Sequence, residues 1–193
     1  MKKKIKKSDI WSLNIHINLK KADSEIKEYL SICKDKLGLI PNILIANATD
    51  KDRFKAFNIF YNRLMQNENY LTKSEKEMIA VVVSSLNRCL YCCVSHSYNL
   101  GRLVKNKILS QKILINYKTA DLNRKHTEML DFTSKLTLSS HLVNENDRSK
   151  LRRVGFNENQ ILEIVEVCAF FNMTNRIASG TNMKPNKEYY LSQ

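Results

Sequence analysis

The sequence predicts an all-α fold, built as a single-domain helical bundle. Apolar residues repeat at spacings of three and four along most of the 193 residues, as they do on the buried face of a helix. The residue types that begin and end helices stand at the junctions between these segments. No segment shows the strict alternation of apolar and polar residues that a half-buried strand requires.

Three helices are predicted in the first third of the chain. The first begins at Ser24 and ends at Gly38, a residue type that favours the left-handed conformation after a helix. Its apolar stripe comprises Ile26, Leu30, Cys33 and Leu37. Pro41 suits the first turn of a short second helix. The third helix ends at the polar sequence QNENY, and its apolar face comprises Phe54, Phe57, Tyr61, Leu64 and Met65.

Two helices are predicted around the middle of the chain. Thr72 and Glu75 have the spacing of a capping box, which marks a helix start. The nearly continuous apolar run that follows predicts a helix buried on most sides. Asn87 and Arg88 interrupt this run, and the next helix is expected to begin at the cysteines and to end at Gly101.

Four more helices complete the expected fold. A connecting helix covers 108–115, and another covers 122–136. A short helix covers 144–155, and the last long helix covers 157–180. Each of these two opens with an Asn that is followed three residues later by Asp or Gln, the pattern of a capped helix start.

The predicted domain organisation has three parts. Residues 1–20 form a basic N-terminal extension, 21–182 form the helical domain and 183–193 form a C-terminal tail. No long segment rich in Gly, Ser or Pro divides the helical domain. The five cysteines do not have the spacing of a disulfide framework, and no apolar stretch has the length of a membrane span. A cytoplasmic location is therefore expected.

The net charge of +13 raises the question of an anionic partner. We expect no nucleic acid and no membrane as partner, because basic and acidic residues are interleaved along the predicted helices and no nucleic-acid-reading motif accompanies them. On the last helix, Arg176 is expected to form an ion pair with Glu163 or Glu166. The single basic run comprises Lys2, Lys3, Lys4, Lys6 and Lys7.

The densest chemical signal is the stretch RCLYCCVSH, residues 88–96. Cys89 and Cys92 have C-x-x-C spacing, and His96 lies one helical turn beyond Cys92. Two cysteines three residues apart on a regular helix are too far apart for a disulfide, so we expect Cys89 to precede the first turn. A helix N-terminus, an imidazole and a partner thiol all favour ionisation, which predicts a reactive thiol here.

Two nearby residues bear on this chemistry. Glu77 lies on the preceding helix and is a candidate proton acceptor, provided that this helix folds back across the cysteines. Cys93 is expected to point away from the pair, because adjacent residues of a helix do not share a face. Which sulfur attacks stays open, since the helix N-terminus favours Cys89 and the nearby His96 favours Cys92.

The spacing Glu-x11-Cys-x2-Cys-x3-His, from Glu77 to His96, resembles the alkylhydroperoxidase D-like (AhpD-like) branch of the carboxymuconolactone decarboxylase superfamily, and especially its peroxidase-related subgroup. The resemblance covers roughly 38–180 and includes the phrases GLIPNILIA, LTKSEKEMIAVVVSSLNRC and LRRVGFNENQILEIVEVCAFFNMTNRIASG. Tyr91 also agrees with the subgroup. Ser95 departs from it, since some relatives carry a second histidine there.

This resemblance implies an AhpD-like bundle with a catalytic helix hairpin, assembled into a homo-oligomer. It implies a thiol-dependent peroxidase in which Cys92 attacks a peroxide substrate and Cys89 then forms a disulfide with it. It further implies that Glu77 and His96 relay the proton, and that an external dithiol reduces the disulfide. Tyr91 is one more candidate catalytic residue. No metal, haem or flavin cofactor is implied.

Three other interpretations use the same residues. A structural zinc site has possible ligands in Cys89, Cys92 and His96, but it needs four ligands and no second pair follows. A redox sensor or an oligomeric scaffold with an oxidisable dithiol differs from a peroxidase only in lacking turnover. A decarboxylase of the wider superfamily is disfavoured, because those relatives lack the redox dithiol.

Overall fold

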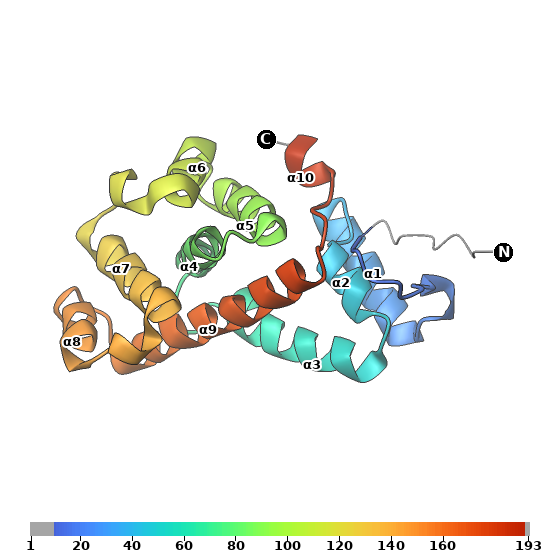
Figure 1. The fold of residues 1–193 in the computed structure, drawn as a ribbon, viewed down its shortest axis with the longest axis horizontal. Coiled ribbons are helices and arrows are strands. Elements are labelled where there is room, and N and C mark those ends of the chain that lie inside the picture. The colour runs from blue at the N-terminus through green and yellow to red at the C-terminus, as the bar shows by residue number, and fades with distance from the viewer. Residues whose placement is uncertain (1–9, 192–193) are drawn as a thin grey trace.

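The computed structural model describes residues 10–191, and every regular element in this range is a helix, which confirms the all-α prediction. The predicted basic run 2–7 lies outside the described residues. The first helices are α1 (Ser24–Leu37), α2 (Asn42–Asn47) and α3 (Lys51–Tyr61), which lie together at one end of the molecule (Figure 1).

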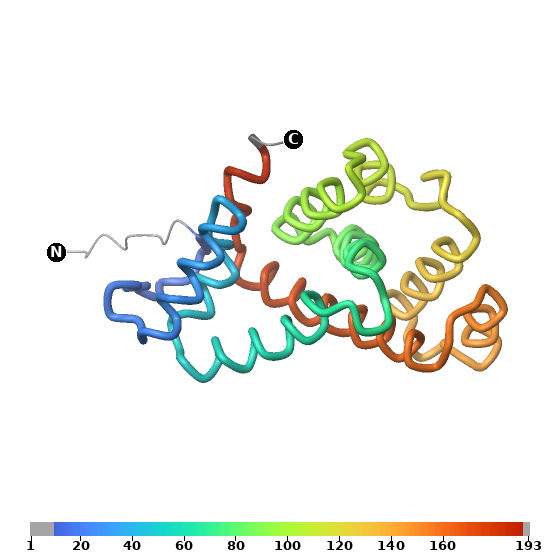
Figure 2. The backbone as a smooth tube through the Cα atoms, turned by 180° about the vertical axis from the view of Figure 1, so that it is seen from behind, coloured from blue at the N-terminus to red at the C-terminus, as the bar shows by residue number. Residues whose placement is uncertain are grey.

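The remaining helices form the larger part of the fold. They are α4 (Lys73–Leu86), α5 (Leu90–Leu103), α6 (Lys107–Asn116), α7 (Arg124–Leu138), α8 (Glu145–Arg153), α9 (Glu158–Gly180) and α10 (Glu188–Leu191). α4 lies at the centre and contacts α5, α6, α7 and α9 (Figures 1 and 2). α9 extends from this group towards the α1–α3 end. α4 therefore has neighbours on most sides, which explains its nearly unbroken apolar sequence.

Helix ends follow the local chemistry that the sequence predicts. Thr72 and Glu75 form a capping box at α4, in which the Glu75 backbone N–H donates to the Thr72 hydroxyl and the Glu75 carboxylate accepts from the Thr72 backbone N–H. The same reciprocal arrangement opens α8 and α9. Gly38 ends α1 with a φ of 75°, a conformation that costs glycine little.

One predicted helix end is wrong, and another helix changes its winding before it ends at the predicted QNENY segment. α5 continues through Gly101 to Leu103, and the glycine has a packing role: a Cβ there would lie 3.0 Å from the Ser110 hydroxyl oxygen on α6. α3 ends at Tyr61 and is followed by a wider π-helical segment, η2 (Asn62–Gln66), which turns Leu64 and Met65 into the interior.

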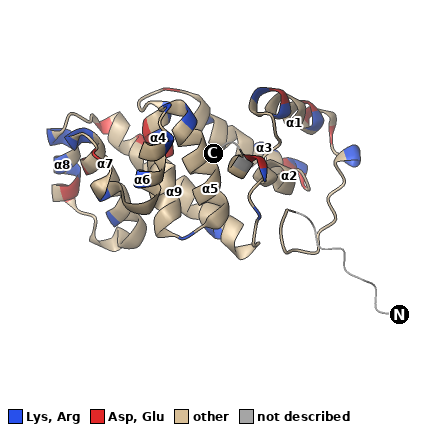
Figure 3. Cartoon of the chain, turned by 90° about the horizontal axis from the view of Figure 1, so that it is seen from above, with Lys and Arg blue, Asp and Glu red and all other residues tan. Residues whose placement is uncertain are grey.

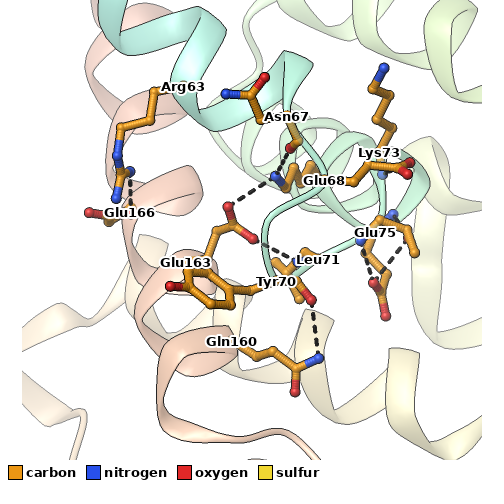
Figure 4. Close-up of polar contacts among 12 residues, drawn as sticks. Arg63, Asn67, Glu68, Tyr70, Leu71, Lys73, Glu75, Gln160, Glu163 and Glu166 are labelled. Atoms are coloured by element: carbon orange, nitrogen blue, oxygen red, sulfur yellow. Dashed lines mark hydrogen bonds and ion pairs between the residues drawn. The ribbon is translucent and has the colours of Figure 1, made fainter.

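A buried ion pair fixes the loop before α4. The Lys76 ammonium donates to Glu163 (3.0 Å) and to the backbone carbonyl of Asn67 (2.6 Å), while the other Glu163 oxygen accepts from the Leu71 backbone N–H at 2.7 Å (Figure 4). The expected pairing of Arg176 with Glu163 or Glu166 is wrong. α9 points Glu163 inward to Lys76, and Arg176 instead donates to the Asn172 carbonyl at 2.7 Å.

The two ends of the described chain meet beside α5. Residues 10–12, which we call the N-terminal strap, run along the segment that follows α9: the Ser12 backbone N–H donates to Thr181 (2.9 Å), and that of Lys184 donates to Ile10 (2.8 Å). These bonds hold Trp11 in a buried apolar cluster that also contains Met183.

Charged residues are dispersed over the described chain. Blue and red segments alternate along α1 and α8 in Figure 3, so the positive net charge does not gather on one helix face there. Within 10–191, no helix combines the length and the apolar composition that crossing a bilayer requires.

Candidate active site

The two C-x-x-C cysteines lie where the α4–α5 hairpin turns. Arg88 has a left-handed backbone (φ 52°), and Cys89 is the extended N-cap residue of α5 (φ −81°, ψ 101°). Cys92 lies in the first turn of that helix. Cys89 precedes the helical turns, and its side chain is within hydrogen-bonding reach of the Cys92 thiol. Both are free thiols, and we refer to them as the dithiol pair.

The dithiol pair shares one proton. A hydrogen bond with the Cys92 thiol lowers the pKa of Cys89 to about 6, and the nearby Cys92 backbone amide, the Ser179 hydroxyl and the His96 ring act in the same direction, while burial opposes them. The same hydrogen bond, together with burial, raises the pKa of Cys92 far above that of an ordinary thiol. The pair therefore loses its first proton easily and its second with difficulty.

Glu77 and His96 lie against each other across the hairpin. The Glu77 carboxylate and His96 Nδ1 are 2.7 Å apart, and both side chains are buried. The other Glu77 oxygen accepts a longer hydrogen bond from the Asn99 amide, at 3.5 Å. An ionised carboxylate only accepts hydrogen bonds, so it directs the Nδ1 hydrogen towards itself and leaves Nε2 able to take up a proton. α4 thus folds back as the role of Glu77 requires.

α9 supplies two polar residues to the dithiol pair that the sequence analysis did not assign to the site. The Asn175 amide hydrogen bonds to Cys92 and the Ser179 hydroxyl to Cys89. Asn175 also accepts from Asn87 (3.1 Å) and is buried. These residues are four apart and so share one face of α9. The polar pair Asn175 and Ser179, four residues apart near the end of a long helix, was the available signal.

Tyr91 has a clear structural contact. Its hydroxyl oxygen accepts a hydrogen bond from the Ile43 backbone N–H at 3.2 Å, which satisfies an amide at the start of α2. Burial raises the pKa of Tyr91 well above its ordinary value, so the hydroxyl stays protonated. Tyr91 thereby ties α2 to α5 beside the dithiol pair.

The other three cysteines differ from the pair in acidity. Burial raises the pKa of Cys93 to about 11, with a smaller contribution from the charge of Cys89. Burial likewise raises the pKa of Cys33 and of Cys168. All three therefore remain thiols near neutral pH.

A cavity of about 440 Å³ leads to the dithiol pair from one side. Cys92, His96 and Glu77 line it, whereas Cys89 does not. The remaining wall is largely apolar and aromatic and includes Phe57, Tyr61, Met65, Phe170, Phe171 and Tyr189. This arrangement brings an easily ionised dithiol and a proton-accepting imidazole to one apolar space, which suits the oxidation of thiols by a small organic molecule.

The model of the carboxymuconolactone decarboxylase family matches residues 52–106. This segment runs from α3 to the end of α5 and contains the dithiol pair, Glu77 and His96. No curated protein matches the chain in sequence.

Two crystal structures resemble the chain along nearly its whole length. An uncharacterized peroxidase-related protein from Silicibacter sp. TM1040 is 42% identical, with 96% of each chain covered and a TM-score of 0.92. A protein from Ralstonia eutropha JMP134, described as an alkylhydroperoxidase AhpD core and as peroxidase-related, is 35% identical, with 92% of this chain and 94% of that chain covered and a TM-score of 0.88. The debrominase Bmp8 shares the fold alone, at 19% identity and a TM-score of 0.75, with 88% of this chain and 90% of that chain covered.

Proposed function

The chain belongs to the carboxymuconolactone decarboxylase family and has its AhpD-like fold, and from that premise we propose that it is a thiol-dependent peroxidase acting on organic hydroperoxides. The observation that carries the proposal is the dithiol pair, which holds one easily lost proton and places Cys92 in a cavity that His96 and Glu77 also line. The name "peroxidase-related" of the relatives at 42% and 35% identity agrees with it.

The first step forms a sulfur–oxygen bond. The Cys92 thiolate attacks one oxygen of the hydroperoxide, the O–O bond breaks, and the leaving alkoxide takes a proton to become an alcohol. Cys92 is then a sulfenic acid, and the peroxide has been reduced by two electrons. His96, oriented by Glu77, is the group placed to carry the proton between the thiol and the leaving oxygen.

The second step closes the disulfide. Cys89 attacks the Cys92 sulfur, the S–S bond forms, and hydroxide leaves and is protonated to water. An external dithiol then reduces the disulfide and becomes a disulfide itself, which returns both protons to the pair. Both sulfurs are buried, with exposures of 1% and 3%, so a small dithiol that enters the cavity suits this step better than the surface of a folded protein.

Access and acidity point to different sulfurs. Cys89 has the lower pKa, but only Cys92 lines the cavity. We assign the attack to Cys92. When Cys89 takes up the proton that the two thiols share along their hydrogen bond, the negative charge moves to Cys92, which is the accessible sulfur. Cys89 then serves as the proton acceptor before it serves as the resolving thiol.

Steady-state reduction of cumene hydroperoxide with a panel of dithiol donors tests the function. A peroxidase consumes many equivalents of hydroperoxide per chain, whereas a redox sensor consumes one equivalent and stops. Stoichiometric oxidation without turnover under every donor would overturn the proposal in favour of a sensor.

Two variants test the assignment of the sulfurs. Cys92→Ser should abolish thiol oxidation, and Cys89→Ser should stop at a Cys92 sulfenic acid that mass spectrometry detects after trapping with dimedone. Unchanged oxidation in Cys92→Ser would make Cys89 the attacking sulfur. Wild-type activity should fall as the pH drops through about 6, because the pair then binds its second proton.

A further inference from the structure

We propose that the cavity selects an anionic, apolar-chained hydroperoxide, whose charged end Lys73 and Arg102 bind. This inference rests on the proposed function and names the class of its substrate. Both residues line the same cavity as Cys92. Among the residues that the structure describes, no other Lys or Arg lines it, and the single acid that does, Glu77, is already bonded to His96 and Asn99.

The hairpin places these cations opposite the reacting sulfur. α4 and α5 are antiparallel, so Lys73 at the start of α4 and Arg102 near the end of α5 lie at the open end, away from the turn that carries the dithiol pair. Ten residues of one helix separate Cys92 from Arg102, which corresponds to about 15 Å along the helix axis. A ligand that reaches both must have an extended chain between its peroxide and its charge.

Neither cation has an acidic partner within the described part of the chain. Other basic side chains there do, such as Lys51 with Asp23 at 2.7 Å and Arg63 with Glu166 at 2.9 Å. The Arg102 guanidinium lies over the ring of Tyr98, at 5.7 Å. Its hydrogen-bond donors are therefore not consumed by a carboxylate among residues 10–191.

Lys73 is similarly placed. Only its backbone N–H donates to an acid, Glu68, at 3.2 Å, and Figure 4 shows its side chain pointing away from Glu75 and Glu163. Two cations on the wall of a largely apolar cavity, neither with an acidic partner in the described range, favour a ligand with one anionic end.

The size and lining of the cavity also argue for a large substrate. Hydrogen peroxide, only slightly larger than a water molecule with its share of about 30 Å³ in the liquid, would fill a small part of about 440 Å³. Apolar and aromatic walls bind a hydrocarbon chain and gain nothing from hydrogen peroxide. The peroxide group then meets Cys92 while the chain runs towards Arg102.

The test compares one molecule with and without its charge. The probes are decanoic acid carrying a terminal hydroperoxide and the methyl ester of the same compound. We expect kcat/KM to be at least about tenfold higher for the acid at low salt, and the difference to shrink as the ionic strength rises. In Lys73→Met/Arg102→Met, the preference for the acid should fall to about one.

Two controls keep the outcomes separate. Lys150→Met removes the same charge on α8, far from the cavity, and should keep the wild-type preference. Reduction of the neutral tert-butyl hydroperoxide should stay within about twofold in every variant, which also reports correct folding. Equal rates for acid and ester in the wild type, or an equal loss of both in the double variant, would overturn the inference and leave the peroxidase function intact.

A binding measurement tests the anion site even if the protein has no peroxidase activity. Calorimetry with the unreactive terminal hydroxy acid and its methyl ester does not depend on turnover. If no hydroperoxide is reduced, tighter binding of the acid that is lost in Lys73→Met/Arg102→Met still supports the anion site. Equal affinities for acid and ester overturn it.

Discussion

Removing the Cys92 sulfur should raise the pKa of Cys89. The hydrogen bond between the two thiols is the largest cause of the low value of about 6, against an ordinary value of 9.0, and burial acts in the opposite direction. At pH 7 a pKa of 6 leaves about 90% thiolate, whereas a pKa of 9 leaves about 1%. Because the Ser179 and backbone contacts remain, we expect Cys92→Ala to lower the thiolate fraction at pH 7 by about tenfold or more.

Thiolate absorbance at 240 nm measures this directly, since it does not require a reagent to reach the buried sulfurs. Cys33, Cys93 and Cys168 all have raised pKa values and stay protonated between about pH 5 and 8. The reduced wild-type protein should therefore gain the absorbance of a single thiolate, with a midpoint near pH 6. Cys93→Ala should leave this midpoint unchanged. A wild-type midpoint above pH 8, or the same midpoint in Cys92→Ala, would refute the shared-proton description.

Three further predictions concern the frame around the site. Lys76→Met should lower the free energy of unfolding in urea by about 3–5 kcal/mol, because it leaves the buried Glu163 carboxylate unpaired, and Lys76→Met/Glu163→Leu should recover most of the loss. Tyr91→Phe should lower the free energy of unfolding by about 1–3 kcal/mol, since the Ile43 amide loses its acceptor. Slower thiol oxidation at unchanged stability would instead give the hydroxyl a catalytic role. Oxidation of the dithiol pair should change the fluorescence of Trp11, the chain's single tryptophan, and constant emission would contradict their packing in one cluster.

Local chemistry made most of the helices predictable. Capping patterns such as Thr72 with Glu75 act within one turn, so neighbouring residues suffice to locate the start of a helix. The extended N-cap position of Cys89 followed from the Asn87-Arg88 break for the same reason. Gly101 was misassigned because its packing partner, Ser110, lies on another helix, and a glycine required for close packing has the same sequence signature as a helix end.

The site was predictable where its residues share a hairpin. Glu77 and His96 follow the spacing of two adjacent helices, and they meet at 2.7 Å. Asn175 and Ser179 come from a helix far along the chain, and periodicity alone does not show which face of α9 meets the sulfurs. The Lys76–Glu163 pair joins two helices in the same way, and it escaped prediction because a lysine in an amphipathic sequence is ordinarily assigned to solvent.

The N-terminal strap has a consequence for biosynthesis. Trp11 is among the first described residues to leave the ribosome, yet Met183, with which it encloses the sulfurs, is among the last. During translation Cys89 and Cys92 are made about midway between these two residues, and they remain without this cover until the segment around Met183 emerges. Emergence of the segment around Met183, in addition to the folding of α5, thus completes the buried environment of the dithiol pair.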